Sequence, residues 1–241
     1  MAAFAQKKRV GLTESQSLRI CKTSTNAFLS SIAYFRKIFP EEMFRQVRWA
    51  DNIQFPTLSF DRKDNKLSLP KDEDANVTLF AKWITESVYE MIEKKYLKKL
   101  SLSISKANAD GTQVSGGGLQ ERYTLNYDYM EDGQVHFYGK TNDKIMIQHN
   151  KKQKNSKFDV NNITKEVKQM IRNIVGINAT LKPLPAHVLV SIEVEFTDNT
   201  PKEYKTRHFI RCTPDGITHF NSSKTNQSYN HNNENNKETT W

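Results

Sequence analysis

The clearest pattern of apolar and polar residues in the chain lies near residue 190. Val188, Val190, Ile192, Val194 and Phe196 alternate there with Leu189, Ser191, Glu193 and Glu195. Successive side chains of a strand point to opposite faces, so a period of two predicts a strand with one buried face. We therefore expect a strand over residues 188–196.

The segment after this strand has a different pattern. It contains Pro201 and Pro214, and only two short β-like stretches, His208–Cys212 and Ile217–Phe220. Stretches this short, interrupted by proline, do not form an independent unit. We expect them either to lie on the body of the protein or to close over something held between them and the body.

Apolar residues spaced by three and four positions predict three helices. The first follows a capping box at Thr13–Gln16 and is expected to continue to Pro40, which stops it. The second covers about residues 74–96. The third begins after Asp159, a good N-cap, and is expected to end at Gly176. Stripes of this kind are more typical of core packing than of a partner helix.

Shorter alternations predict the remaining strands. They indicate a hairpin between Leu58 and Leu69 that turns at Asp61–Lys66, strands at 100–104 and 123–129, and weaker strands at 135–138 and 144–148. The resulting order predicts an α+β fold in which three helices pack on a largely antiparallel sheet.

Composition changes little between the predicted elements, which indicates one domain. We expect this domain over residues 13–220, after a flexible N-terminus at residues 1–12. Residues 221–241 are rich in asparagine and poor in apolar residues, and are expected to be a disordered tail.

The net charge of +9 favours acidic surroundings such as nucleic acid or chromatin. A polar loop contains the candidate DNA contacts Lys151, Lys152, Lys154 and Lys157, although a single cluster of this kind is more often a solvated lysine surface. The sequence contains neither an apolar run long enough to span a membrane nor a signal peptide. We expect a soluble protein with no membrane partner, whose two cysteines are reduced thiols.

Motifs for catalysis are missing from the sequence. Gly139–Thr141 has the ending of a phosphate-binding loop, but Gln134 stands where the first glycine of that loop is required. His208, Cys212 and His219 are not accompanied by the second ligand pair that a structural zinc site needs. We therefore expect no enzymatic activity, no metal and no cofactor.

Several stretches resemble one known family, the HORMA domain, and in particular its meiotic chromosome-axis group. Residues 17–44 resemble the first helix of that domain through Tyr34–Arg36 and Ile38–Glu41. Residues 57–65 and 79–105 are similar to its next hairpin and second helix. The sequence LKPLPAHVLVSIEVEF, followed by TPKEY, resembles the strand and the opening of the mobile C-terminal segment of the family.

This resemblance implies a peptide-binding module with a C-terminal safety belt, here residues 198–220, which we call the belt, after a core at residues 13–197. In HORMA domains the belt wraps around a short partner segment, the closure motif, which adds as a strand between the core strand and the belt. Such a strand gains main-chain hydrogen bonds from an open sheet edge, and side-chain pockets give specificity.

By the same resemblance, the protein is a non-enzymatic scaffold of the meiotic chromosome axis in the nucleus, which supports synapsis and recombination. Its implied partners are closure motifs of axis or HORMA-family proteins, and an AAA+ ATPase that grips the N-terminus and interconverts two belt conformers. Chromatin or DNA is a further candidate partner. The alternatives are a HORMA adaptor in the spindle checkpoint or translesion repair, and a basic nucleic-acid-binding module.

The resemblance also assigns candidate site residues, some of which equally fill a core. The ligand-side strand is Val188, Leu189, Val190, Ser191 and Ile192, with Met170 and Ile174 as part of its floor; Pro201 and Tyr204 open the belt; and His208, Phe209, Ile210, Arg211, Thr218, His219 and Phe220 clamp the peptide. The belt lacks the proline-rich, glycine-bearing stretch that follows the tyrosine in some relatives.

Overall fold

The structure is a computed structural model that describes residues 13–49, 53–58, 61–63, 66–68, 75–112, 114, 118–131, 133, 135–141, 144–145, 160–212 and 219–222. The predicted flexible N-terminus and the lysine loop at 151–157 lie outside these residues. Most of the predicted tail does too, although its first two residues, Asn221 and Ser222, belong to a strand.

The helical elements are α1 (Glu14–Phe35), the 3-10 turn η1 (Glu41–Met43), α2 (Ala75–Lys82), the π-helical segment η2 (Trp83–Val88), α3 (Tyr89–Glu93) and α4 (Val160–Thr180). The strands are β1 (Phe44–Trp49), β2 (Ile53–Leu58), β3 (Asp61–Lys63), β4 (Lys66–Ser68), β5 (Leu97–Lys106), β6 (Leu119–Tyr129), β7 (Val135–Thr141), β8 (Lys144–Ile145), β9 (Val188–Phe196), β10 (Phe209–Cys212) and β11 (His219–Ser222). Because α2, η2 and α3 are continuous, three long helices are present in the described part, as predicted.

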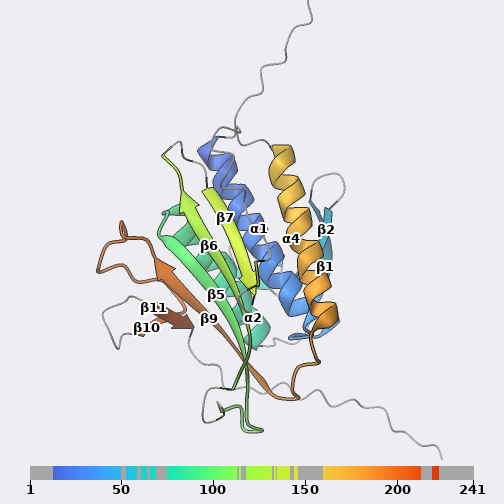
Figure 1. The fold of residues 1–241 in the computed structure, drawn as a ribbon. Coiled ribbons are helices and arrows are strands. Elements are labelled where there is room, and N and C mark those ends of the chain that lie inside the picture. Colours follow the sequence, from blue (N-terminus) through green and yellow to red (C-terminus); the bar gives the residue numbers. More distant parts are fainter. Residues whose placement is uncertain are drawn as a thin grey trace, which may run out of the picture.

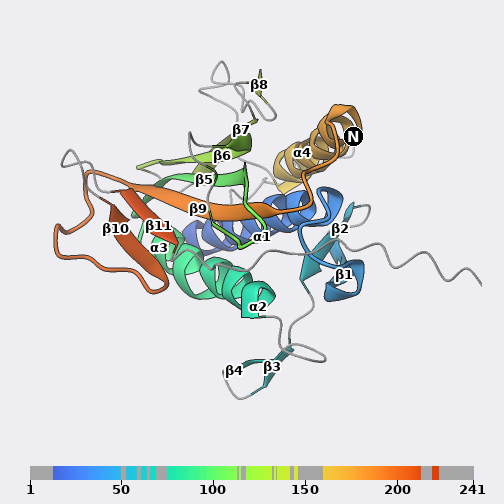
Figure 2. The same cartoon turned by 90° about the horizontal axis from the view of Figure 1, so that it is seen from below.

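The main sheet has seven strands in the order β10-β11-β9-β5-β6-β7-β8, and each neighbouring pair is antiparallel. Its central strand, β5, pairs with β6 on one side and with β9 on the other. Figures 1 and 2 show α1 and α2 on one face of this sheet, with α4 beside α1. The predicted α+β fold with a largely antiparallel sheet is confirmed.

The alternation of β9 is confirmed by its burial. Ile192 and Val194 are at most 1 % exposed, and Val188, Val190 and Phe196 pack against the same core. The strands predicted at 100–104, 123–129 and 135–138 are also present, as parts of β5, β6 and β7. One side of the sheet is therefore buried by helices, as the period of two requires.

Helix α1 begins as predicted but ends early. The hydroxyl of Thr13 accepts a hydrogen bond from the Gln16 amide (3.2 Å), and the Gln16 side chain accepts one from the Thr13 amide (2.9 Å). The helix ends at Phe35 rather than at Pro40, because Lys37 has a left-handed φ of 52° and the Ile38 amide donates back to the carbonyl of Ala33 (2.9 Å). This terminal turn satisfies carbonyls of the last helical turn.

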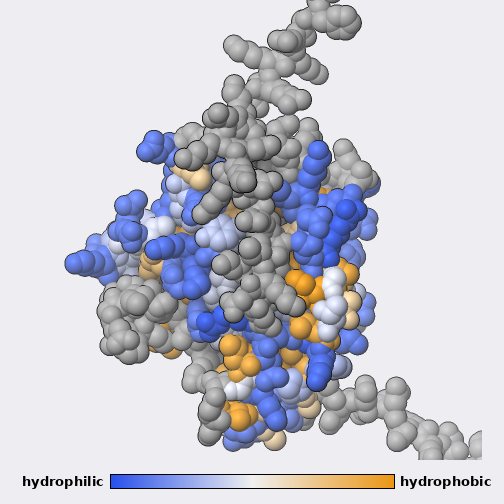
Figure 3. Space-filling model, in the orientation of Figure 1, coloured by the Kyte–Doolittle hydropathy of each residue, from blue (hydrophilic) through white to orange (hydrophobic). Residues whose placement is uncertain are grey.

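The predicted end of the third helix at Gly176 is wrong, because α4 continues to Thr180. A Cβ at Gly176 would have no neighbour within 4 Å, so this glycine lies on an open surface and is not forced by packing into a cap. Pro183 then keeps the preceding residue out of helical geometry. Figure 3 shows apolar surface gathered over the lower part of α4, and Val175 of this helix is 42 % exposed.

The predicted hairpin between Leu58 and Leu69 needs correction. Leu58 ends β2, which pairs with β1 so that Leu58 lies opposite Phe44. A separate short hairpin joins β3 to β4, with Asp61 opposite Ser68. Strand β1 was not predicted, because apolar and polar residues alternate only weakly in its sequence FRQVRW and all six residues keep some exposure.

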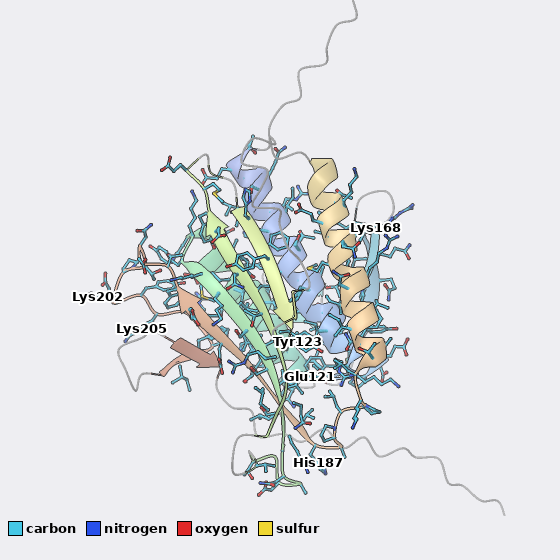
Figure 4. All side chains as sticks on the ribbon, in the orientation of Figure 1. Glu121, Tyr123, Lys168, His187, Lys202 and Lys205 are labelled. Atoms are coloured by element: carbon cyan, nitrogen blue, oxygen red, sulfur yellow. The ribbon has the colours of Figure 1, made fainter. Side chains whose placement is uncertain are left out.

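A buried ion pair joins the end of α1 to β6. The guanidinium of Arg36 donates two hydrogen bonds to the carboxylate of Glu121, one of them from Nε at 2.9 Å, and a third to the carbonyl of Lys182 at 2.8 Å. Both side chains of the pair are 6 % exposed. Tyr123 also donates to Glu121 (2.7 Å), and burial together with this contact raises the pKa of Tyr123. Figure 4 shows Glu121 and Tyr123 along the same strand. The network therefore fixes the segment that leads into β9.

We expect Glu121→Ala to destabilise the domain by about 3–5 kcal/mol, because it leaves the Arg36 charge buried without its partner. Urea unfolding followed by circular dichroism measures this loss. Glu195→Ala is the matched control, since it removes the half-exposed pair with Lys99 and should cost about 0–1 kcal/mol. Equal losses in the two variants would contradict a structural role for the buried network.

Candidate peptide-binding site

The two sides of β9 are paired over different lengths. On one side β5 accompanies β9 from Val188 to Phe196. On the other side β11 pairs with it only at Glu193–Glu195, where Phe220 lies opposite Val194. Figure 2 shows β11 and β10 beside this end of β9. In this conformation the belt itself therefore occupies part of the edge that the sequence assigns to a ligand strand, and no third strand lies between β9 and β11.

Over Val188–Ser191, which we call the entry edge, no strand of the described residues pairs with this side of β9, and these four residues are half-buried. Four residues of strand span about 13 Å at about 3.3 Å per residue. An unpaired edge of this kind presents main-chain donors and acceptors to an incoming extended chain.

Two candidate residues on α4 are deeply buried. Met170 and Ile174 have no exposed surface, and both belong to the hydrophobic core together with Val167. In this conformation they pack inside the domain. Their helix packs mainly on α1, so a place for them beneath a peptide on β9 stays a prediction.

The first part of the belt is fastened to the body, together with Thr197 before it. We call residues 197–208 the belt base. The amide of Thr197 donates to the carbonyl of Tyr96 (2.8 Å), and its hydroxyl donates to the carbonyl of Lys95 (3.0 Å). The amide of Tyr204 donates to the carbonyl of Pro201 (3.0 Å), which closes a turn. Both residues predicted to open the belt therefore lie in the belt base.

The Tyr204 ring is the centre of this attachment. It makes edge contacts with Tyr96 (centroids 4.9 Å apart) and Phe196 (5.5 Å), and the ammonium of Lys94 lies 5.0 Å from its centroid. Its hydroxyl donates to the carboxylate of Glu90 (3.3 Å). Burial, followed by the negative charge of Glu90, raises the pKa of Tyr204 to about 12. The ring thus links the belt to both α3 and β9.

A second attachment comes from the π-helical segment η2. The Ser87 hydroxyl donates to the carbonyl of Arg207 (2.7 Å), and His208 Nε2 lies 2.7 Å from Glu86 Oε2. His208 has a left-handed φ of 60°, a strained conformation for a residue with a side chain. Segments of π-helix often mark functional sites, because the additional residue alters which side chains face a neighbour.

Beyond His208 the belt changes character. Phe209 is 9 % exposed and joins the core, whereas Ile210 is 56 % exposed. Arg211 lies in β10 and His219 and Phe220 lie in β11, while Thr218 is outside the described residues. The described clamp residues after His208 therefore lie in two antiparallel strands at the edge of the sheet.

Sequence reasoning missed the body side of the belt attachment. Glu86, Ser87 and Glu90 carry no motif, and a π-helical turn has no residue pattern that separates it from an α-helix. Among the residues that the structure describes, no group of three or more acidic, histidine or cysteine side chains is arranged to hold a metal ion. None of the described helices is both long and apolar enough to cross a membrane.

A family model and the similar curated proteins point to the same family. The sequence model of the HORMA domain matches residues 17–237. The chain is 24% identical over 209 residues to "Meiosis-specific protein HOP1" of Saccharomyces cerevisiae, and 28% identical over 219 residues to "Meiosis-specific protein ASY1" of Arabidopsis thaliana. These alignments cover 85% and 88% of this chain but 33% of each relative, so the chain spans about a third of their length.

Solved structures show the same fold. The structure of C. elegans HTP-1 bound to the HIM-3 closure motif has a TM-score of 0.60 at 15% identity, and covers 89% of this chain and 91% of that one. C. elegans HTP-2 bound to the HIM-3 closure motif gives 0.61 at 15% identity, with 92% and 96% covered. At this level of identity the likeness concerns the fold.

We expect Tyr204→Ala to loosen the belt base, because two ring contacts and one cation–π contact are lost. At about 0.5–1 kcal/mol each, these amount to about 2 kcal/mol, or an about thirty-fold drop in amide protection. Hydrogen exchange of residues 205–212 measures this effect. Tyr204→Phe retains the rings and should keep most of the protection, as should the exposed control Lys202→Ala (Figure 4). Unchanged exchange in Tyr204→Ala would show that the ring does not fasten the belt.

Proposed function

The chain belongs to the HORMA-domain family, and from this membership we propose that it is a non-enzymatic peptide-binding scaffold of the meiotic chromosome axis. The names of the yeast and plant relatives support the meiotic assignment. The bound closure motifs in the nematode structures support peptide capture as the activity. The proposed role is assembly of the axis, with synapsis and recombination depending on it.

The observation that carries this proposal is the short pairing of β11 with β9. Only Glu193–Glu195 are involved, so exchanging β11 for a partner strand replaces a few main-chain hydrogen bonds by equivalent ones. Each contributes about 0.5–1.5 kcal/mol, so the two arrangements differ by a small free energy. Two packings of one sequence that lie this close are the basis of known conformational switches.

The proposed site combines the edge of β9 with the belt. Val188–Ile192 pair with the partner strand above the floor to which Met170 and Ile174 belong. The belt base stays attached through Tyr204, while the hairpin from Phe209 to Phe220 leaves β9 and closes over the peptide. The proposal thus involves two belt conformers. In one the belt is folded back onto β9, and in the other it is closed over a ligand.

The proposed partners follow from the same reading. They are closure motifs of axis or HORMA-family proteins, and an AAA+ ATPase that engages residues 1–12 and resets the belt. The proposed location is the nucleus, on chromosomes. The net charge of +9 favours an additional contact between DNA and the loop at Lys151–Lys157, which lies outside the described residues. A checkpoint or translesion adaptor uses the same site with a different partner segment.

Locking the hairpin tests this proposal directly. Glu193 and Asn221 are Cα partners of the β9–β11 ladder, and antiparallel partners lie about 4.5–5.5 Å apart, within reach of a disulfide. In the Glu193→Cys/Asn221→Cys variant, oxidation should prevent stable capture of peptides selected on the wild-type domain from a phage-displayed library of random 16-residue segments. Biolayer interferometry with these peptides measures capture.

The same double variant under reducing conditions is the matched control and should recover slow dissociation. Glu193→Cys alone controls for the loss of the Glu193 carboxylate, and Asn221→Cys alone controls for the change at Asn221. Equal affinity and lifetime of the oxidised and reduced proteins would overturn the exchange of β11 for a partner strand. Failure of the wild-type domain to select any peptide would overturn peptide capture itself.

A further inference from the structure

A cavity lies directly beyond the first residue of β9. It has a volume of about 270 Å³, and its walls include Phe35, Ile38, Leu184, Pro185 and Val188. We call it the Leu184 cavity. At about 30 Å³ for each water molecule, this volume equals about nine waters, which is enough room for a large apolar side chain.

The walls of this cavity come from two segments that the buried ion pair holds together. One is the terminal turn of α1, where Lys37 adopts its left-handed conformation. The other is residues 181–186, whose Lys182 carbonyl accepts a hydrogen bond from Arg36. Two prolines, Pro183 and Pro185, further restrict this segment, since each fixes its own φ. The cavity is therefore formed by restrained backbone.

Val188 connects the cavity to the unpaired edge of β9. It lines the cavity and is also the first residue of the entry edge, Val188–Ser191. An extended chain that pairs with the entry edge is therefore carried to the mouth of the cavity. The main-chain groups of this edge, which no described strand pairs, select an extended polypeptide, and the mainly apolar walls select an apolar side chain on it.

The entry edge also continues the line of pairing that β11 makes. Glu193–Glu195 follow directly after Ile192 in the same strand, so a chain paired with Val188–Ser191 can extend by replacing β11 residue by residue. The belt base, fixed by Tyr204 and by the contacts of Arg207 and His208, does not need to move. The detached hairpin can pivot after His208.

We propose that the entry edge and the Leu184 cavity form the entry site for the partner segment. The segment pairs first with Val188–Ser191 and places one apolar side chain in the cavity; it then displaces β11 from Glu193–Glu195. This inference rests on the proposed function and adds to it the order of events and a specificity pocket. An apolar residue at one fixed position is thus required in the partner segment.

Ala186→Trp tests the entry site, because Ala186 is exposed and lines the cavity, so that a larger side chain can fill it. The probe is the fluorescein-labelled library peptide that dissociates most slowly from the wild-type domain. We expect its association rate constant, measured by stopped-flow anisotropy, to fall at least ten-fold, with less than a three-fold change in the dissociation rate constant. Ala179→Trp, on an exposed position of α4 outside the cavity, is the matched control and should change neither.

Two further measurements keep the inference testable. Ala186→Leu fills less of the cavity and should give an intermediate association rate, which covers the case in which the tryptophan variant is unstable. The oxidised Glu193→Cys/Asn221→Cys protein should still bind the probe weakly and reversibly through the entry site, and adding Ala186→Trp should abolish this weak binding.

The outcomes separate the entry site from the function on which it depends. If the probe binds Ala186→Trp and the wild type at equal rates, or if the oxidised protein shows no weak binding, the entry site is wrong while peptide capture stands. If no peptide is selected on the wild-type domain, both are overturned.

Discussion

The pairing of one strand edge governs what this domain can do. β9 pairs along its whole length with the central strand β5 and buries Ile192 and Val194 in the core, so its position is fixed, yet its outer side must find hydrogen-bond partners from elsewhere. Within the described part of the chain, only three residues of β9 find such partners, on the C-terminal strand β11. A fixed strand with a short and replaceable neighbour is suited to exchanging that neighbour for a segment of another protein.

The rest of the fold keeps this edge rigid while its neighbour can move. Arg36 ties α1 and β6 to the segment before β9, and Tyr204 ties the segment after β9 to α3. Both ends of β9 are therefore anchored by polar contacts in partly or fully buried surroundings. The proposed movement concerns β10 and β11 beyond His208, where Ile210 is already mostly exposed while Phe209 still packs into the core and would have to leave it.

Sequence patterns predicted the elements whose burial is one-sided. The alternation at 188–196 and the capping box at Thr13 both reappear as predicted, because each reports a local requirement. The end of α4 was misplaced because an exposed glycine can remain helical when nothing crowds it. The attachment of the belt to η2 could not be read from the sequence, since it joins residues more than a hundred positions apart through a main-chain carbonyl at Arg207. The length over which β11 leaves the edge of β9 unpaired could not be predicted either, because the register of a strand pair depends on both strands.

The π-helical turn within the long helix α2–η2–α3 is in effect a one-residue insertion. Each residue of a regular α-helix advances by about 100° around the axis, so an additional residue without the wider turn would rotate everything that follows by that angle, whereas the π turn takes up the residue and keeps the two α-helical parts in phase. Without the wider turn, Glu90 and Lys94 would be turned away from Tyr204. The rotation of this helix about its axis therefore decides whether Glu90 and Lys94 face Tyr204 and hold the belt base.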